Sequence, residues 1–229
     1  MSMSTSRIAR AVAAKDLRIE LRSRVVTNQV LPFSGLVMIM FAFALDNDDV
    51  LQRTAGGLVW LATLFSLFIL VQRTFAVETY DGALDSLRVA GVNPQGIFIG
   101  KSVALFVQLL ILESVLFVAA VVLYRVNVNG SGAVLLVTCV LCATAGLAFV
   151  GTLYGGLTAG ARGRETLLPL LLLPVVAPVL ICATRATESA FRSGGVTVGE
   201  GWPWVAVLAV FAAVFGLGGL LSFGSLIEE

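Results

Sequence analysis

Cysteine is the first residue type in this sequence that could carry out chemistry. Cys139 and Cys142 form a Cys-x-x-Cys pair, a spacing typical of thiol redox centres and of zinc sites. However, residues 138–143 are mostly apolar, Cys182 lies in another apolar run, and the chain has no histidine to complete a metal site. The missing imidazole also removes the usual general base and the commonest axial ligand of haem iron. We therefore expect the cysteines to be small packing residues.

Residues 96–102, GIFIGKS, come close to a phosphate-binding loop. The GxxxxGK[ST] motif, however, would need glycine in place of Gln95. The string also opens an apolar run instead of following a buried strand, so its amides would not be free to hold phosphate. We expect no nucleotide and no other cofactor on this chain, and any ATP must be bound by a separate subunit.

Glu113 is the one acidic residue well inside an apolar run, with Gln108 and Ser114 as polar neighbours. A charge at that depth costs roughly 2.5 kcal/mol or more, so a functional role is the default hypothesis for such a residue. The alternative is a protonated glutamate that is hydrogen-bonded to another helix. Intramembrane hydrolysis is not indicated, because no apolar run holds two acids and histidine is absent. We expect the chain not to be an enzyme.

Residues 72–101 form a charged segment between two long apolar runs, with a short helix predicted over residues 78–90. Apolar and acidic residues recur at helical spacing on two different faces of this helix, a pattern that favours docking against a partner. Gly91 suits the end of the helix, and Pro94 would stop it from resuming. The apolar face consists of Tyr80, Leu84 and Leu87, and the acidic face of Glu78, Asp81 and Asp85.

The elements that must position these residues are membrane spans. The chain has 229 residues and is 58% hydrophobic, well above the roughly 45–50% of a soluble domain. Its net charge of +1 gives no reason to expect nucleic acid as a partner. We predict a single all-α membrane domain over residues 1–229, with six helices crossing the lipid bilayer. The predicted spans are residues 30–45, 56–71, 102–124, 133–159, 167–183 and 204–226.

Basic residues set the expected orientation of these spans. Residues 1–26 are rich in arginine and are predicted to form an interfacial helix along the inner membrane surface. The string Ala-Phe-Ala at 42–44 also fits a cleavable signal peptide. Lysine and arginine gather in the alternate flanks 1–26, 72–101 and 158–166. The positive-inside rule therefore places both termini and the 72–101 loop in the cytoplasm.

Glycines and prolines inside the apolar runs indicate close helix packing and bending. Gly-x-x-x-Gly spacings at 151–155 and 156–160, and the glycines within 216–219, let helix backbones approach one another, either within the chain or at a dimer face. Three prolines in the fifth run imply kinks, which are either structural bends or a conformational hinge. They are Pro169, Pro174 and Pro178.

This plan resembles the type-2 permeases of ATP-binding-cassette (ABC) exporters, which have six spans, an inner-surface helix and a cytoplasmic coupling helix between spans two and three. A narrower likeness, over residues 15 to about 182, is to the haem exporter protein B (CcmB) family of cytochrome c maturation. The last span matches that family only in kind. The similar strings are KDLRIELRSR (15–24), WLATLF (60–65), RTF (73–75), ExxxGALDxL (78–87) and LLLPVVAPVLI (171–181).

The resemblance implies a multi-pass permease subunit in a bacterial inner membrane, with haem as the candidate substrate of the whole complex. Its implied partners are a cytoplasmic CcmA-like ATPase, CcmC-like and CcmD-like haem-handling membrane subunits, and a second copy of the chain. The 78–90 helix would couple the ATPase to the spans, its apolar face filling a groove and its acidic face meeting basic groups on the rim. Two alternatives are a type-2 permease for a lipid, glycan or drug, and a scaffold subunit that moves nothing.

Overall fold

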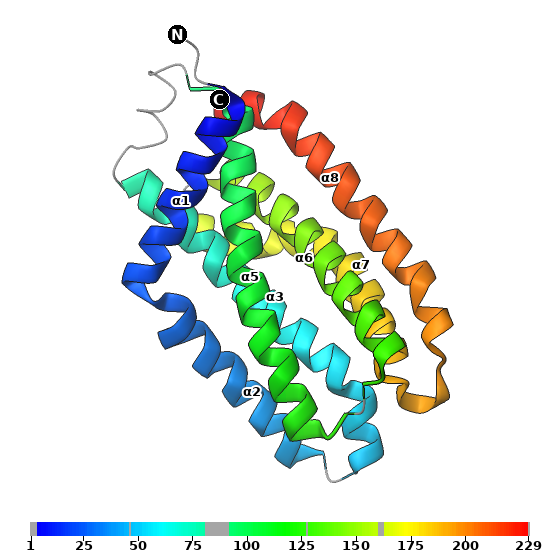
Figure 1. The fold of residues 1–229 in the computed structure, drawn as a ribbon. Coiled ribbons are helices and arrows are strands. Elements are labelled where there is room, and N and C mark those ends of the chain that lie inside the picture. The colour runs from blue at the N-terminus through cyan, green and yellow to red at the C-terminus, as the bar shows by residue number, and fades with distance from the viewer. Residues whose placement is uncertain (1–3, 46, 81–91, 127, 160–162, 229) are drawn as a thin grey trace.

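The fold is a bundle of long helices, seen in the computed structural model of Figure 1, which describes residues 4–45, 47–80, 92–126, 128–159 and 163–228. Seven α-helices and three short helical turns account for nearly all of these residues. The α-helices are α1 (Thr5–Ser23), α2 (Leu31–Ala44), α3 (Asp48–Tyr80), α5 (Pro94–Tyr124), α6 (Gly130–Thr158), α7 (Arg164–Phe191) and α8 (Trp202–Glu228). The short turns are a π-helix (Val26–Val30) and two 3-10 helices (Ser193–Gly195 and Val198–Gly201).

Within the described residues, six helical segments are long and apolar enough to cross a membrane, which confirms the predicted fold of six spans. Each segment overlaps one predicted apolar run, and α3, α5 and α7 extend well beyond theirs. About 20 helical residues are enough to cross some 30 Å of hydrocarbon. The additional turns of these helices can therefore lie outside the hydrocarbon, where their polar residues meet water. The segments are Val26–Ala44, Asp49–Ala76, Pro94–Tyr124, Gly130–Thr158, Glu165–Phe191 and Val198–Ser225.

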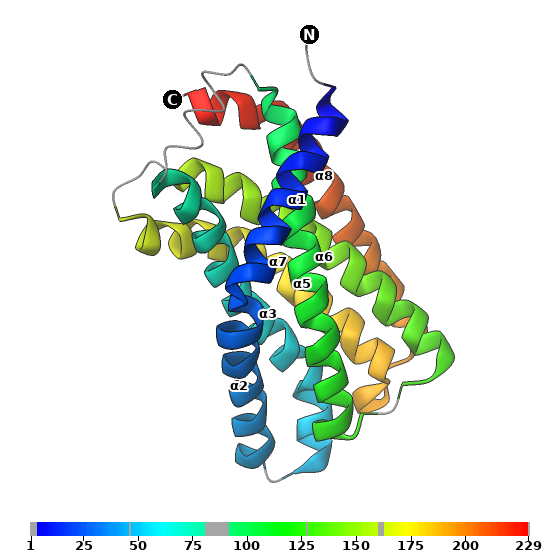
Figure 2. The ribbon, with the colours of Figure 1, turned by 60° about the vertical axis from the view of Figure 1, so that its left-hand side comes forward.

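The two chain ends lie at the same end of the bundle, as expected for an even number of spans (Figures 1 and 2). We call this the terminal end, and it also holds the last turns of α3 and the first turns of α5. The opposite, distal end holds the first turns of α3 and α6 and the last turn of α7. Residues 81–91, which contain most of the predicted coupling helix, lie outside the described residues.

Helix α1 packs against the first turns of α5, and the two run in the same direction (Figure 2). The helix expected within residues 1–26 is therefore present, whereas its location at the membrane surface stays a prediction. Its buried face includes Ile8, Val12 and Asp16, and Leu21 on another face is 77% exposed. The helix ends at Arg24, whose φ of 51° breaks the helical path. The carboxylate of Glu20 then accepts the N–H of Val26 at 2.7 Å and stabilises the turn into α2.

Pro94, expected to stop a preceding helix, opens α5. Proline is well tolerated in the first turn, where its missing N–H would have no helical partner. Asn93 caps the helix, its side chain accepting the N–H of Gln95 at 2.9 Å. Helices α3 and α5 thus extend into the 72–101 segment from both sides, as far as Tyr80 and from Pro94.

The predicted small-residue contacts of α6 lie within the chain. A Cβ on Gly151 would approach Val71 of α3 to 2.9 Å, and one on Gly156 would approach Phe223 of α8 to 2.8 Å. Gly219 of α8 lies directly against the ring of Phe98 in α5. These glycines bring α6 and α8 close to their neighbours, which is the role that small residues have in membrane helix packing.

Helix α7 remains a single helix from Arg164 to Phe191 although it contains all three prolines. It is tied to α3 by a buried hydrogen bond, in which the indole N–H of Trp60 donates to Thr187 Oγ1 at 2.9 Å. The Thr187 hydroxyl donates in turn to the main-chain oxygen of Ala183 at 2.7 Å. A buried indole N–H needs such a partner, so this contact fixes the register of α3 against α7.

Candidate functional site

The predicted coupling residues fall at the edge of the described chain. Glu78 and Tyr80 belong to the last turn of α3. Asp81, Leu84, Asp85 and Leu87 lie outside the described residues, so their role stays a prediction. What can be described is the set of helices that enter and leave this segment.

A buried ion pair joins α1 to α5 close to that segment. Lys101 Nζ lies 3.4 Å from Asp16 Oδ2, and the two side chains are 1% and 6% exposed. Lys101 Nζ also lies 4.6 Å from the ring centroid of Phe75, near the end of α3. We call these three residues, together with Gly96 and Gly100, the α1–α3–α5 junction. A charge buried to this extent is retained only when its partners hold it in place.

The two glycines of the junction let α1 approach α5 at backbone distance. A Cβ on Gly96 would come within 2.7 Å of Ile8, and one on Gly100 would come within 2.7 Å of the main-chain oxygen of Ala9. The same glycines made residues 96–102 look like a phosphate-binding loop. Their spacing is a small-x-x-x-small pattern, which the sequence analysis recognised in α6 and missed here.

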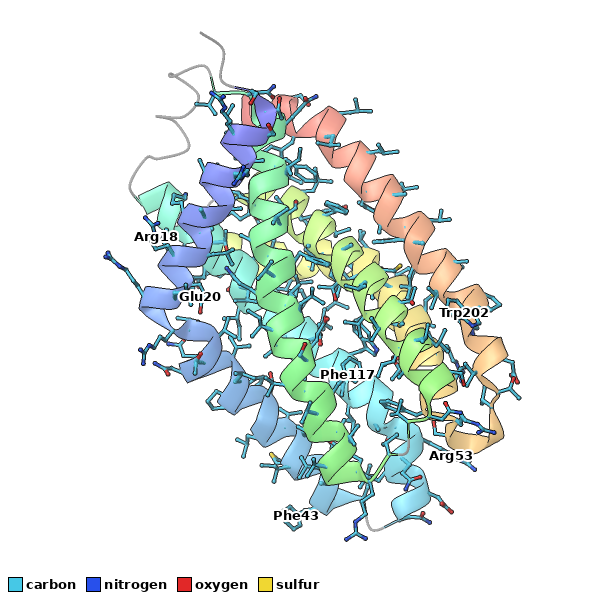
Figure 3. The ribbon with its side chains drawn as sticks, in the orientation of Figure 1. Arg18, Glu20, Phe43, Arg53, Phe117 and Trp202 are labelled. Atoms are coloured by element: carbon cyan, nitrogen blue, oxygen red, sulfur yellow. The ribbon has the colours of Figure 1, made fainter. Side chains whose placement is uncertain are left out.

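The cleft beside the junction is too small for a substrate. Its volume is about 20 Å³, room for about one water molecule. Glu20 of α1, labelled in Figure 3, lines it together with Arg73 of α3 and Gln108 of α5. Among the described residues the junction is a packed contact between three helices.

Glu113 lies entirely buried between α5 and α6. Its Oε2 is 2.5 Å from the hydroxyl oxygen of Thr144, and that oxygen is 2.6 Å from the main-chain oxygen of Val140. One threonine hydroxyl has a single proton and can donate to only one of these two acceptors. If the hydroxyl donates to Val140, as is common in helices, then the proton of the Glu113–Thr144 hydrogen bond must come from Glu113, as a neutral carboxylic acid. Its second oxygen, Oε1, has no hydrogen-bond partner in the described part of the chain.

Replacing Glu113 with glutamine is expected to keep the stability of the chain, because an amide N–H₂ can donate to Thr144 as the protonated acid does. Glu113→Ala removes the donor and should lower the free energy of unfolding by about 2 kcal/mol. Thermal unfolding in detergent measures both variants, with permease-dependent ATPase activity as the functional readout. Equal losses in the two variants would show that Glu113 acts through its negative charge.

The cysteines of the Cys-x-x-Cys pair form no disulfide and take part in no candidate metal cluster. Cys139 is buried and its thiol donates to the main-chain oxygen of Ala183 at 3.7 Å, while Cys142 is half-buried. Among the described residues, no group of three His, Cys, Asp or Glu side chains is placed to hold a metal ion. Cys139 contributes instead to the packing of α6 on α7.

Comparison with known proteins agrees with this architecture. The profile of the family described as "CcmB protein" matches residues 7–221. A "Heme exporter protein B" of Rhodobacter capsulatus is 31% identical over 176 residues, 75% of this chain and 78% of the relative. One of Pseudomonas aeruginosa is 27% identical over 90% of this chain and 92% of its own length.

A more distant similarity points to the wider transporter class. "ABC transporter G family member 20" of Dictyostelium discoideum is 29% identical over 137 residues, which are 60% of this chain and only 18% of that protein. The family match covers nearly the whole bundle, from α1 into α8, and the relatives are matched over most of their own length. The chain is a multi-pass membrane protein, and it belongs to the CcmB family.

Proposed function

We propose that the chain is the transmembrane permease subunit of an ABC transporter complex linked to haem delivery in cytochrome c maturation. A separate ATPase subunit hydrolyses ATP, and this chain converts that work into rearrangement of its membrane helices. The proposal is supported by family membership and by the relatives named heme exporter protein B. The observation that carries the coupling step is the α1–α3–α5 junction, which joins both helices that flank residues 81–91.

The mechanism follows from what the junction connects. A push on the 78–90 segment displaces the last turn of α3 and the first turns of α5. Because Lys101 is held between Asp16 of α1 and the ring of Phe75 in α3, the three helices move together at this end. Apolar anchors on Tyr80, Leu84 and Leu87 carry most of the affinity for the ATPase, and the acidic residues Glu78, Asp81 and Asp85 orient it.

The orientation and partners belong to the same proposal. The terminal end faces the cytoplasm of a bacterial inner membrane, since the basic flanks lie there. The partners are a CcmA-like ATPase, CcmC-like and CcmD-like haem-handling subunits, and a second copy of the chain. Haem is the cargo of the assembly, and the absence of histidine from the sequence agrees with haem iron being ligated by other subunits.

Replacing Leu84 and Leu87 together with aspartate is expected to abolish co-purification with the ATPase and permease-dependent ATP hydrolysis. Two charges in place of two apolar anchors would leave the groove of the ATPase unfilled and carry unpaired carboxylates into it. The matched control replaces both leucines with isoleucine and should keep both activities. Unchanged co-purification and hydrolysis in the aspartate variant would refute the coupling role of this segment.

A permease for another cargo is the second candidate, favoured by the similarity to an ABC transporter G family member. Reconstitution of the complex in liposomes distinguishes between haem transport, transport of another cargo and a scaffold role. ATP-dependent movement of a haem analogue supports haem as cargo, and movement of a lipid or drug instead supports the second candidate. Stable complexes that hydrolyse ATP but move nothing support a scaffold role.

A further inference from the structure

A polar cavity opens at the distal end of the bundle, away from the junction. Its volume is about 740 Å³, within the range of small-molecule sites. Three separate segments meet there, namely the first turns of α3, the residues before α6, and the end of α7. Arg53 of α3 and Arg192 after α7 both line it, and Figure 3 labels Arg53 at this end of the molecule.

The guanidinium groups of the two arginines have no polar partner among the described residues. In the part of the chain that the structure describes, neither guanidinium forms an ion pair or a side-chain hydrogen bond, whereas Arg185 nearby is paired with Glu188 at 3.0 Å. Asp49 is the one acidic residue among the cavity-lining residues described. The lining therefore carries one more positive than negative side chain, and its five-donor guanidinium groups are free to bind.

The exposed side chain of Arg53 lies against the turn at residues 193–195. A Cβ on Gly194 would lie 3.4 Å from Arg53 Nε and 3.7 Å from its Cδ, so the arginine side chain runs along the backbone of the 193–195 turn. Gly194 has a φ of 71°, a backbone conformation that residues with a side chain rarely adopt. The turn thus leaves room for Arg53 and brings it to the same cavity as Arg192.

Arg192 occupies a backbone position that normally favours glycine. Its φ is 54°, in the left-handed region that costs a non-glycine residue about 1 kcal/mol. Arg24 and Arg125 end their helices in the same way, so the conformation alone does not single out Arg192. The distinguishing feature is the second guanidinium in the same cavity, which Arg24 and Arg125 do not share.

Helix ends of both signs meet at this cavity. The first turns of α3 and the cap residue Asn129 of α6 line it at helix N-termini, which carry partial positive charge, whereas α7 ends there with its partial negative C-terminus. Asn47 and Asn129 already accept several of the amide N–H groups there, at 2.8–3.3 Å. The strong donors left for a ligand are therefore the guanidiniums, whose planar fork matches carboxylate and phosphate oxygens.

We propose that this cavity binds the carboxylate or phosphate groups of an amphiphile whose apolar part stays in the membrane. Its lining is mostly polar, with Phe191 and Val128 as the apolar residues, which suits a headgroup better than a whole porphyrin ring. Trp202 and Trp204, 44% and 37% exposed, begin α8 at the same end, as is typical of the membrane–water boundary. The ligand groups are either haem propionates or phospholipid phosphates. Haem as the source rests on the proposed function, whereas phospholipid as the source is independent of it.

The test uses the full chain in nanodiscs with two kinds of probe. One probe is mesoporphyrin IX, compared with its dimethyl ester, which has the same ring and no free carboxylates. The other is phosphatidylglycerol, whose retention by the purified chain is measured by native mass spectrometry. Arg53→Gln and Arg192→Gly are each expected to weaken binding about tenfold, the loss of one charged hydrogen-bonding partner.

Arg192→Gly separates binding from structure. Glycine is favoured at φ 54°, so this variant should keep or raise the thermal stability of the chain while binding falls. Arg125→Gln is the matched control, because Arg125 has the same conformation at the same end and does not line the cavity. Loss of porphyrin binding that spares phosphatidylglycerol identifies haem propionates as the ligand, and the reverse identifies lipid.

Binding that is unchanged in Arg53→Gln and Arg192→Gly, or equally reduced in Arg125→Gln, would overturn the assignment. The Leu84→Asp/Leu87→Asp variant is measured in parallel and should lose ATPase coupling but bind the probes normally. Failure of the coupling proposal is thus distinguishable from failure of the anion site.

Discussion

Replacing Asp16 with leucine is expected to lower the free energy of unfolding in detergent by about 3 kcal/mol. The substitution removes the carboxylate that lies 3.4 Å from Lys101 Nζ, and the Lys101 side chain is only 1% exposed. An ammonium group buried to this extent is poorly solvated, so removing one member of the pair costs far more than the pair contributes net. Denaturant unfolding followed by circular dichroism measures the loss, and protease sensitivity of α1 reports whether it detaches from α5.

The double variant Asp16→Leu/Lys101→Met should recover most of this loss, because apolar residues can replace a buried ion pair at little cost. Lys15→Met is the control, since Lys15 Nζ lies 3.1 Å from the other Asp16 oxygen but is 43% exposed. Water screens the half-exposed Lys15 ammonium, so this variant should lose much less stability than Asp16→Leu. If the double variant is no more stable than Asp16→Leu, the charge pair is not what holds the junction.

The second large effect is expected at Gly132, in the first turn of α6, where alanine should cost about 3 kcal/mol. A Cβ there would overlap the main-chain oxygen of Ala190 in α7. A backbone atom cannot rotate away as a side chain can, so α6 and α7 must separate. Gly132 also donates its N–H to Asn129 at 2.8 Å, and the cap of α6 would move with it.

Gly130→Ala provides the matched control two residues earlier in the same helix. No atom lies within 4 Å of a Cβ on Gly130, so alanine should have an effect smaller than about 0.5 kcal/mol. Thermal unfolding of the two variants in the same detergent compares them directly. Equal stabilities would mean that the α6–α7 crossing tolerates a wider separation than the structure has.

The spans could be predicted from the sequence because each is a local run of apolar residues long enough to cross hydrocarbon. Their ends could not, since polar turns such as the start of α3 and the start of α5 continue the same helices outside the apolar window. Glu113 was recognised from its depth alone. Its partner Thr144 is 31 residues away on another helix, and no local pattern indicates which helices will be neighbours.

Lys101 illustrates the same limit at the candidate site. In the sequence it is one of several basic residues flanking an apolar run, and in the structure it is buried because Asp16, 85 residues earlier, faces it. Gly96 and Gly100 have the spacing of a helix contact, but their similarity to a phosphate-binding loop drew attention to a different chemistry. Arg53 and Arg192 have no signal in the sequence, because only the fold brings them to one cavity.

The packing of α1 on α5 also bears on how the protein is made. Helix α1 is synthesised before α5, and most of the surface that covers Ile8 and Val12 belongs to residues 96–101. At a synthesis rate of about 5–20 residues per second, α1 waits on the order of ten seconds for that surface. During this interval its apolar face lacks the α5 surface that covers it in the folded chain. The contact of α1 with α5 can therefore form only after the chain has been synthesised as far as the start of the third span.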